Sequence, residues 1–458
     1  MQVRIPVTEA ERPPLTTDKE AFMVYEVNLS GGAAKPNWPK SDSSLNVLIG
    51  RGERHELPVL ERTNMLVTGV VGTGKTCFTK AYLHELLRSS PSLPAVFFEI
   101  KKEDYMAEFY EDGDKVITYD PNFDGGTVFR WNMIKELRQA KDQAAELDEL
   151  TNALFQDLIE KAQQNLVWAN AARVTFKAYL STILNCFHDD PSNDIVLARL
   201  KRMTHLELME FLAKYAPNLP MLKDNFNYEP GKKDYELPRK GHDAMFFMQY
   251  VVEKFSGSFI AKGEDTIYDF LHWKHGKHLF IVHDFRAAES MSMFERYFLR
   301  KIITEKLSCT SDVYGEPLLL ALDEVDKIGS DFGIFNAVTL GRQFGLQLIL
   351  STQSIENFYN VAPDRNGEHI TNASLSGFPI LAAFRPGDDV TIEKLQTLFG
   401  SCDRKKMALG LSRGDKPIVQ IVTEPKVTDS MFQSLGLGEC YIKVLNSDPV
   451  RCKIELNT

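Results

Sequence analysis

The chain has 458 residues, of which 43% are hydrophobic and 25% are charged, and its formal net charge is −10. This composition excludes fibrous and disordered proteins, and the length predicts one large domain with an insertion, or two domains. The acidic balance argues against a protein that coats nucleic acid with a basic surface, but it leaves open DNA held in a local channel.

The cysteines and the N-terminus indicate the compartment. No cysteine lies in a CxxC pair or at metal-ligand spacing from a histidine, which predicts free thiols and no structural zinc in a reducing cytoplasm. Residues 1–15 lack the apolar core of a signal peptide, and no apolar run reaches about 18 residues. We therefore expect a cytoplasmic protein without a transmembrane helix, which reaches the inner face of a membrane only through a partner.

The N-terminal third predicts strands around one helix. Residues 1–60 hold several prolines and short apolar runs such as 22–25, and they predict lead-in strands at a sheet edge. An amphipathic helix pattern covers 75–87. Because strand patterns precede and follow this helix, we predict a parallel sheet with crossover helices. The strand patterns lie at 64–69, 95–100 and 115–120.

The rest of the chain divides into a helical stretch and a second set of strands. Strand patterns nearly vanish from 133 to about 266, where leucines recur at helical spacing, and we predict a mostly helical insertion with a polar loop at 225–242. Strand patterns then return around a helix at 293–307. They lie at 278–285, 318–324, 346–352, 379–385 and 418–423, with a terminal hairpin of 440–445 and 451–456. The predicted divisions are 1–60, 61–132, 133–275 and 276–458.

The strongest chemical signal is a glycine-rich string that fits G-x-x-x-x-G-K-[ST] between a strand and a helix. Its glycines let backbone N–H groups surround a phosphate, and the helix N-terminus adds partial positive charge. Lys75 is expected to reach the β- and γ-phosphates of ATP, and Thr76 to ligate Mg²⁺. The alternative is a glycine turn with a surface lysine. The predicted cofactor-binding residues are Gly69, Gly72, Thr73, Gly74, Lys75, Thr76 and Cys77.

A second signal is the apolar run 318–322 that leads into Asp323 and Glu324. A buried parallel strand that ends at a phosphate site has this pattern. Asp323 is therefore expected to hold the magnesium shell, and Glu324 to polarise the attacking water. The alternative is a core strand with acidic residues at its solvent end. Lys75 and Asp323 are 248 residues apart, which requires an inserted domain and agrees with the helical stretch.

Two further candidates flank the apolar strand 346–352. Gln353 follows it, where an amide can sense the γ-phosphate or position water. Arg342 lies at the other end of the same unit. It is poorly placed to reach its own nucleotide, but it can serve a neighbouring subunit as an arginine finger. The alternatives are a surface glutamine and a surface arginine.

Together these residues resemble the TraG/TraD-like type IV coupling proteins, in the FtsK/HerA superfamily of hexameric RecA-like motors. The resemblance implies an α/β RecA-like P-loop core with a mostly parallel sheet and an inserted all-α domain. It also implies an ATP-driven homohexamer that moves DNA to a secretion channel, with the all-α domain facing DNA and relaxase or relaxosome partners. The resemblance extends over about residues 45–425. The segments on which it rests are Ile49-Gly50, GVVGTGKT, FFEIKKED, YDP before FRWN, W-x-x-x-A from Trp168, LALDE, and GRQFGLQ before STQS.

The resemblance also implies residue roles. Lys75 and Thr76 match the phosphate and magnesium contacts, Asp323 and Glu324 the metal-shell residue and catalytic base, Gln353 the sensor, and Arg342 the trans-acting finger. Three departures are expected. We expect neither the N-terminal membrane anchor of many members nor a long C-terminal recruitment tail. Glu99-Ile100-Lys101-Lys102 replaces D-x-K-G, so Glu99 and Lys101 receive no role.

Two other functions stay open. A HerA-like translocase for DNA processing or defence is favoured by the expected lack of an anchor. A nucleotide-gated adaptor that recruits protein substrates is disfavoured by the complete set of catalytic residues. The form of the DNA, single-stranded or duplex, is also open, because a basic cluster is usually a solvated face and a ring of subunits needs little charge from each. The basic clusters are Arg404-Lys405-Lys406, Lys232-Lys233 and Arg239-Lys240.

Overall fold

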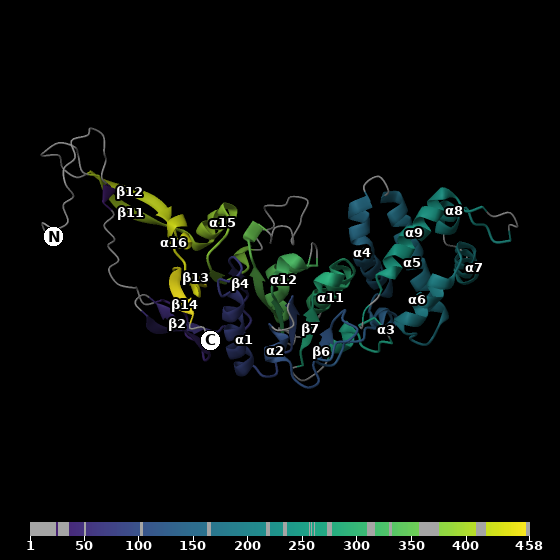
Figure 1. The fold of residues 1–458 in the computed structure, drawn as a ribbon, viewed down its shortest axis with the longest axis horizontal. Coiled ribbons are helices and arrows are strands. Elements are labelled where there is room, and N and C mark those ends of the chain that lie inside the picture. Colours follow the sequence, from purple (N-terminus) through teal and green to yellow (C-terminus); the bar gives the residue numbers. More distant parts are fainter. Residues whose placement is uncertain are drawn as a thin grey trace.

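The computed structural model is an elongated molecule with a large sheet in its middle (Figure 1). A group of helices lies at one end, and the hairpin of β11 (Ser401–Ala408) and β12 (Ile418–Pro425) lies at the other. The structure describes residues 24–25, 36–49, 52–100, 104–162, 166–216, 220–231, 236–255, 257, 259–260, 262–272, 277–308, 317–328, 332–356, 375–408 and 418–454.

Eleven strands of the described residues form the large sheet, in the order β3-β2-β14-β13-β10-β4-β9-β8-β5-β7-β6. The strands from β10 to β6 are parallel, and the remaining pairs are antiparallel. The prediction of a mostly parallel α/β core is therefore confirmed. The strands are β2 (Ser44–Ile49), β3 (Glu53–Pro58), β4 (Met65–Thr68), β5 (Ala95–Glu99), β6 (Lys115–Ile117), β7 (Leu279–Val282), β8 (Leu318–Leu322), β9 (Leu346–Thr352), β10 (Ile380–Ala383), β13 (Glu439–Val444) and β14 (Val450–Ile454).

The helices fall into two groups along the chain. Those that belong to the sheet are α1 (Lys75–Ser89), α2 (Met106–Phe109), α11 (Ala288–Ser308), α12 (Ile334–Leu340), α15 (Asp389–Phe399) and α16 (Asp429–Gln433), with the 3-10 turns η3 (Phe285–Ala287), η4 (Val325–Lys327) and η5 (Gly341–Phe344). Those between β6 and β7 are α3 (Met133–Gln139), α4 (Gln143–Ala162), α5 (Leu166–Cys186), α6 (Asn193–Arg202), α7 (His205–Tyr215), α8 (Pro220–Phe226), α9 (Arg239–Glu253) and α10 (Ile267–Leu271). Where the structure describes this second stretch, it contains no strand, as predicted.

The sheet is covered on both faces because its central strands are apolar throughout. All four residues of β4 are buried. Side chains alternate between the faces of a strand, so Met65 and Val67 share a core with Phe78 of α1. Leu66 belongs to the core of the other face, together with Phe294 of α11. Strands buried on both faces are typical of parallel sheets.

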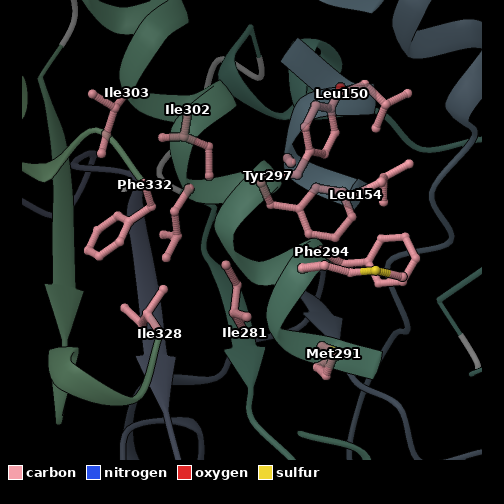
Figure 2. Close-up of a cluster of buried hydrophobic side chains, with 14 of the residues drawn as sticks. Leu150, Leu154, Ile281, Met291, Phe294, Tyr297, Ile302, Ile303, Ile328 and Phe332 are labelled. Carbon is pink, nitrogen blue, oxygen red and sulfur yellow. The ribbon is translucent and has the colours of Figure 1, made fainter. Parts of the chain in front are cut away.

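The core of the second face continues from α11 into α4. Figure 2 shows Leu150 and Leu154 of α4 beside Phe294 and Tyr297 of α11. A buried polar contact accompanies this packing, because the Tyr297 hydroxyl donates to Glu146 of α4 at 2.8 Å. Lys301 of α11 also pairs with Glu146. The helices between β6 and β7 are therefore attached to the sheet layer through α11.

The predicted polar loop at 225–242 is too long. Helix α8 continues to Phe226, and α9 already begins at Arg239. Pro238 occupies the cap position of α9, where the missing N–H of proline costs no hydrogen bond. From Ala244 onward α9 has buried residues at helical spacing. This apolar face stabilises the helix, so the helix includes a first turn whose residues are polar.

A second sheet has the order β1-β11-β12 among the described residues. Its first strand, β1 (Val24–Tyr25), confirms an edge strand for the second half of the apolar run 22–25, whose first two residues lie outside the described residues. Strand β12 confirms the strand predicted at 418–423. Strand β11 was not predicted, because its sequence SCDRKKMA is polar. Pairing with β12 along eight residues makes it a strand regardless of its composition.

A membrane-spanning helix was not expected from the sequence. None of the helices in the described part of the chain combines the length and apolar composition that crossing a bilayer requires.

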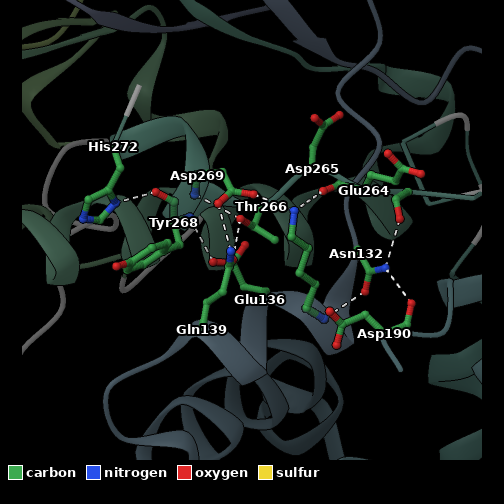
Figure 3. A network of polar contacts seen from close by, with 12 residues as sticks. Asn132, Glu136, Gln139, Asp190, Glu264, Asp265, Thr266, Tyr268, Asp269 and His272 are labelled. Atoms are coloured by element: carbon green, nitrogen blue, oxygen red, sulfur yellow. Dashed lines mark hydrogen bonds and ion pairs between the residues drawn. The ribbon is translucent and has the colours of Figure 1, made fainter. Parts of the chain in front are cut away.

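Glu136 of α3 is a buried acid that ties this helix to the first turn of α10 (Figure 3). Its carboxylate accepts hydrogen bonds from the backbone N–H of Ile267 at 2.6 Å and of Tyr268 at 3.1 Å. It also accepts one from the Trp131 indole at 3.3 Å. Burial nevertheless raises the pKa of Glu136 to about 7, with Lys301 opposing this rise. The folded protein therefore holds a proton here at a pH where an unfolded chain has released it.

We expect Glu136 to make the free energy of unfolding fall by roughly 3 kcal/mol as the pH rises from the unfolded pKa of 4.5 to the folded pKa of about 7. Below this window both states are protonated, and above it both are ionised. In the variant Glu136→Gln the fall should be smaller by that amount. Urea unfolding of both proteins between pH 4.5 and 8 measures it, and two parallel pH profiles would contradict the raised pKa.

Candidate active site

The glycine-rich loop follows β4 and runs into α1. Gly69 has a φ of 147°, a backbone conformation that other residues rarely adopt. A Cβ at this position would also lie 2.6 Å from Cβ of Phe384. Gly72 and Gly74 have positive φ angles as well. Glycine favours this path at all three positions, and at the motif glycine Gly69 the contact with Phe384 leaves no room for a side chain.

The N-terminus of α1 supplies the donors expected of a phosphate site. Gly74 occupies the N-cap position and has no side chain that could accept a hydrogen bond from the helix. The first N–H groups of the helix are therefore left for an external acceptor. They belong to Lys75, Thr76 and Cys77, and the Cys77 side chain is exposed. The Thr73 hydroxyl instead donates to the Val70 carbonyl at 2.7 Å and stabilises the loop.

Lys75 points into the loop rather than to solvent, and its side chain is buried. Its ammonium donates to the carbonyls of Gly69 at 2.7 Å and Val70 at 3.2 Å. Burial lowers the pKa of Lys75, while Asp323 and Glu324 oppose this change. The alternative of a surface lysine on a glycine turn is therefore wrong.

The strand β8 places Asp323 opposite the start of α1. The Thr76 hydroxyl donates to the Asp323 carboxylate at 3.4 Å, although the two residues are 247 positions apart. Asp323 is buried, and burial raises its pKa. A threonine hydroxyl and a carboxylate side by side are oxygen ligands of the type that Mg²⁺ uses next to phosphates. This pair of residues fits the predicted magnesium position.

Glu324 is held in an unusual backbone conformation, with a φ of 45° and a ψ of 52°. Left-handed conformations are uncommon outside glycine, and they concentrate at functional sites. The Gln353 amide, which follows β9, donates to the Glu324 carboxylate at 2.9 Å. The structure thus brings Gln353 and Glu324 together beside Asp323, at the edge of the sheet where the glycine-rich loop lies.

Arg342 does not join this group. It is exposed on η5, which precedes β9, whereas Gln353 follows the same strand. Seven strand residues separate the two ends by roughly 23 Å. Arg342 therefore lies at the opposite edge of the sheet, out of reach of the loop of its own chain, as the sequence analysis expected.

Glu99 is a site residue whose surroundings the sequence did not reveal. It ends β5 next to β8 and is fully buried, and it accepts the N–H groups of Tyr105 at 2.6 Å and Met106 at 3.2 Å. Burial raises its pKa to about 7, with Asp323 adding to the rise. The available signal was an acid that ends the apolar strand AVFFE. Lys101 lies outside the described residues.

Two backbone segments that are distant in sequence brace the glycine-rich loop. After β10, the Arg385 carbonyl accepts the N–H of Val70 at 3.0 Å. Before β13, the N–H of Gly438 donates to the Thr73 carbonyl at 3.0 Å. No sequence motif marks either contact, since both use backbone atoms only.

Two arginines of the basic clusters lie near acidic side chains in the described part of the chain. Arg239 lies on the first turn of α9, exposed and 3.8 Å from Asp243. Arg404 of β11 lies 4.0 Å from Glu424 on the neighbouring strand. Lys232 and Lys233 lie outside the described residues, and so do the side chains of Lys405 and Lys406.

The chain is similar in fold to solved structures of a conjugative coupling protein and of VirB4. The conjugative coupling protein TrwB in an unbound form matches with a TM-score of 0.68 and 17% identity, over 92% of this chain and 90% of that one. TrwB in complex with ADP and Mg²⁺ matches with a TM-score of 0.63 and 17% identity, over 87% and 86%. VirB4 of Thermoanaerobacter pseudethanolicus matches with a TM-score of 0.53 and 12% identity, over 91% and 97%.

Comparison by sequence is consistent with these folds. No curated protein sequence matches the chain. The family model described as the type IV secretion-system coupling protein DNA-binding domain matches residues 57–456, which is most of the chain. The resemblance drawn from the motifs is thereby confirmed, and the chain belongs to the family of the type IV secretion-system coupling protein DNA-binding domain.

Proposed function

We propose that the chain is an ATP-hydrolysing coupling ATPase, which binds ATP with Mg²⁺ on the glycine-rich loop. The observation that carries this proposal is the convergence of Thr76, Asp323, Glu324 and Gln353 beside Lys75, from the ends of two strands and the start of one helix. The structures of TrwB with ADP and Mg²⁺ and with a non-hydrolysable ATP analogue support the same ligands here.

Each residue of the site has a task in hydrolysis. Thr76 and Asp323 would hold Mg²⁺, which when bound neutralises charge on the phosphates. Lys75 exchanges its carbonyl partners for phosphate oxygens. The N–H groups of the loop and of α1 hold the phosphate chain in place. Glu324 accepts a proton from the attacking water, and the Gln353 amide fixes the orientation of the Glu324 carboxylate.

The position of Arg342 supports an oligomer as the active form. An exposed arginine at the far edge of the sheet is able to serve only the site of another subunit. We therefore propose a ring, most simply a hexamer, in which Arg342 of one subunit stabilises the transition state at the next. Residues 133–275 form the inserted all-α domain of each subunit in this proposal.

The ring would move DNA through its centre and deliver DNA, or DNA with a bound relaxase, to a transfer channel at the inner face of a membrane. The DNA-binding description of the family model supports DNA as the substrate. The net charge of −10 argues against a general basic surface, so we propose that the DNA contacts lie in a local channel.

The test is steady-state ATP hydrolysis by the purified chain without DNA, with single-stranded DNA and with duplex DNA. A DNA motor should hydrolyse ATP several-fold faster with one of the two DNA forms, and the preferred form identifies the substrate. Glu324→Gln serves as the blank. Hydrolysis that no DNA accelerates would contradict the translocase and favour a nucleotide-gated adaptor of protein substrates.

A further inference from the structure

A turn far from the glycine-rich loop in sequence lies against it in space. The N–H of Gly438 donates to the Thr73 carbonyl at 3.0 Å. A Cβ on Gly74 would lie only 3.4 Å from Cα of Gly438, so the turn lies directly beside the loop. The turn of residues 436–438, which precedes β13, is therefore part of the wall around the phosphate site.

Several hydrogen bonds fix the shape of this turn. The N–H of Glu439 donates to the Gly436 carbonyl at 3.2 Å, and the Glu439 carboxylate accepts the Gly436 N–H at 2.9 Å. Arg451 of β14 holds the same carboxylate at 2.7 Å. Gly438 has a φ of 74°, which a turn of this kind requires at that position. The contacts that shape the turn are thus made within the chain itself.

The rigid turn carries an exposed leucine. Leu437 is 65% exposed, whereas Leu435 two residues earlier is 2% exposed and belongs to the core. A single exposed leucine on a surface needs no explanation. Here, however, the leucine is held in a fixed turn whose next residue is hydrogen-bonded to the phosphate loop. An apolar surface so placed is suited to cover part of a ligand that extends from the loop.

The order of the strands gives the direction in which such a ligand extends. In the sheet, β4 lies between β9 and β10, with β8 beyond β9 and β13 beyond β10. Glu324 and Gln353 follow β8 and β9, so the reacting γ-phosphate of a nucleotide must point to that side. The α-phosphate and the nucleoside then extend to the other side of the loop, where β10 and β13 lie.

We propose that Leu437, on the turn of residues 436–438, contacts the base of the bound nucleotide and forms one wall of the nucleoside site. This inference rests on the proposed binding of ATP to the loop. A leucine side chain has no hydrogen-bonding group, so it contacts the face of a base and not its edge. Adenine and guanine both present the flat face of a purine ring, so the contact stabilises either purine nucleotide to a similar extent.

The experiment compares two ligands that share the phosphates but differ in the nucleoside. Binding of Mg²⁺-ATP and of Mg²⁺-tripolyphosphate to wild type and Leu437→Ala is measured by calorimetry. We expect Leu437→Ala to bind ATP roughly tenfold more weakly, which is the size of effect typical of a lost apolar contact. Tripolyphosphate affinity should stay at the wild-type value. Leu437→Trp, with a larger face for the base, should bind ATP at least as well as wild type.

Two control variants separate the possible failures. Leu340→Ala removes a leucine that is 44% exposed at the opposite edge of the sheet, and it should leave both affinities unchanged. Lys75→Ala should lose both ligands. If Leu437→Ala weakens the binding of ATP and of tripolyphosphate equally, the turn supports the loop and the proposed base contact is wrong. Unchanged ATP affinity would overturn it as well. If wild type binds neither ligand, the proposed function itself fails.

Discussion

Glu324→Gln is expected to lower kcat for ATP hydrolysis by a factor of about 10² to 10⁴, the usual contribution of a general base. The amide has nearly the shape of the carboxylate but cannot accept the proton of the attacking water. It retains an oxygen for the Gln353 amide, which contacts Glu324 at 2.9 Å in the wild type. The affinity for ATP should therefore stay close to the wild-type value. Steady-state hydrolysis measures kcat, and calorimetry measures the affinity.

The control for this variant is Glu393→Gln, which neutralises an exposed acid on α15. It should keep the wild-type kcat. Gln353→Ala should lower kcat without lowering the affinity, because it removes the amide that orients Glu324. Should Glu324→Gln hydrolyse ATP at the wild-type rate, Glu324 would not be the base, and the left-handed conformation of this residue would need another explanation.

The second large effect is expected from Arg342→Ala, which should lower kcat by a factor of about 10³ to 10⁵ if Arg342 acts as an arginine finger. Arg342 lies at the opposite edge of the sheet from its own glycine-rich loop. A loss of this size therefore requires that Arg342 acts at the nucleotide site of a neighbouring subunit. Nucleotide affinity should change little, because Lys75 and the loop are intact.

Mixing the variants Arg342→Ala and Lys75→Ala tests the subunit arrangement directly. Each is inactive alone, but in a mixed ring some sites combine an intact Lys75 with an intact Arg342 from the neighbour, and part of the activity should return. Arg88→Ala is the matched control, since it removes an exposed arginine at the end of α1, and it should keep full activity. If no mixing ratio restores hydrolysis, Arg342 does not act between subunits.

The sequence by itself determined the parts of this protein that depend on contiguous residues. The glycine-rich loop needs one strand, one turn and one helix N-terminus in succession, and all three are readable between Met65 and Ser89. The roles expected of Lys75 and Thr76 came from this contiguous pattern, and those expected of Asp323 and Glu324 came from the apolar run that precedes them. The alternation of apolar strands with helices also predicted a mostly parallel sheet.

Only the tertiary structure decided which distant segments meet. Strand order is a non-local property, so the sequence could not place Thr76 at 3.4 Å from Asp323 or Glu99 in a buried position beside β8. Strand β11 was missed because pairing with β12, and not its polar composition, makes it a strand. The contact of Gly438 with Thr73 joins backbone atoms, and such a contact requires no particular side chain that a sequence pattern would reveal.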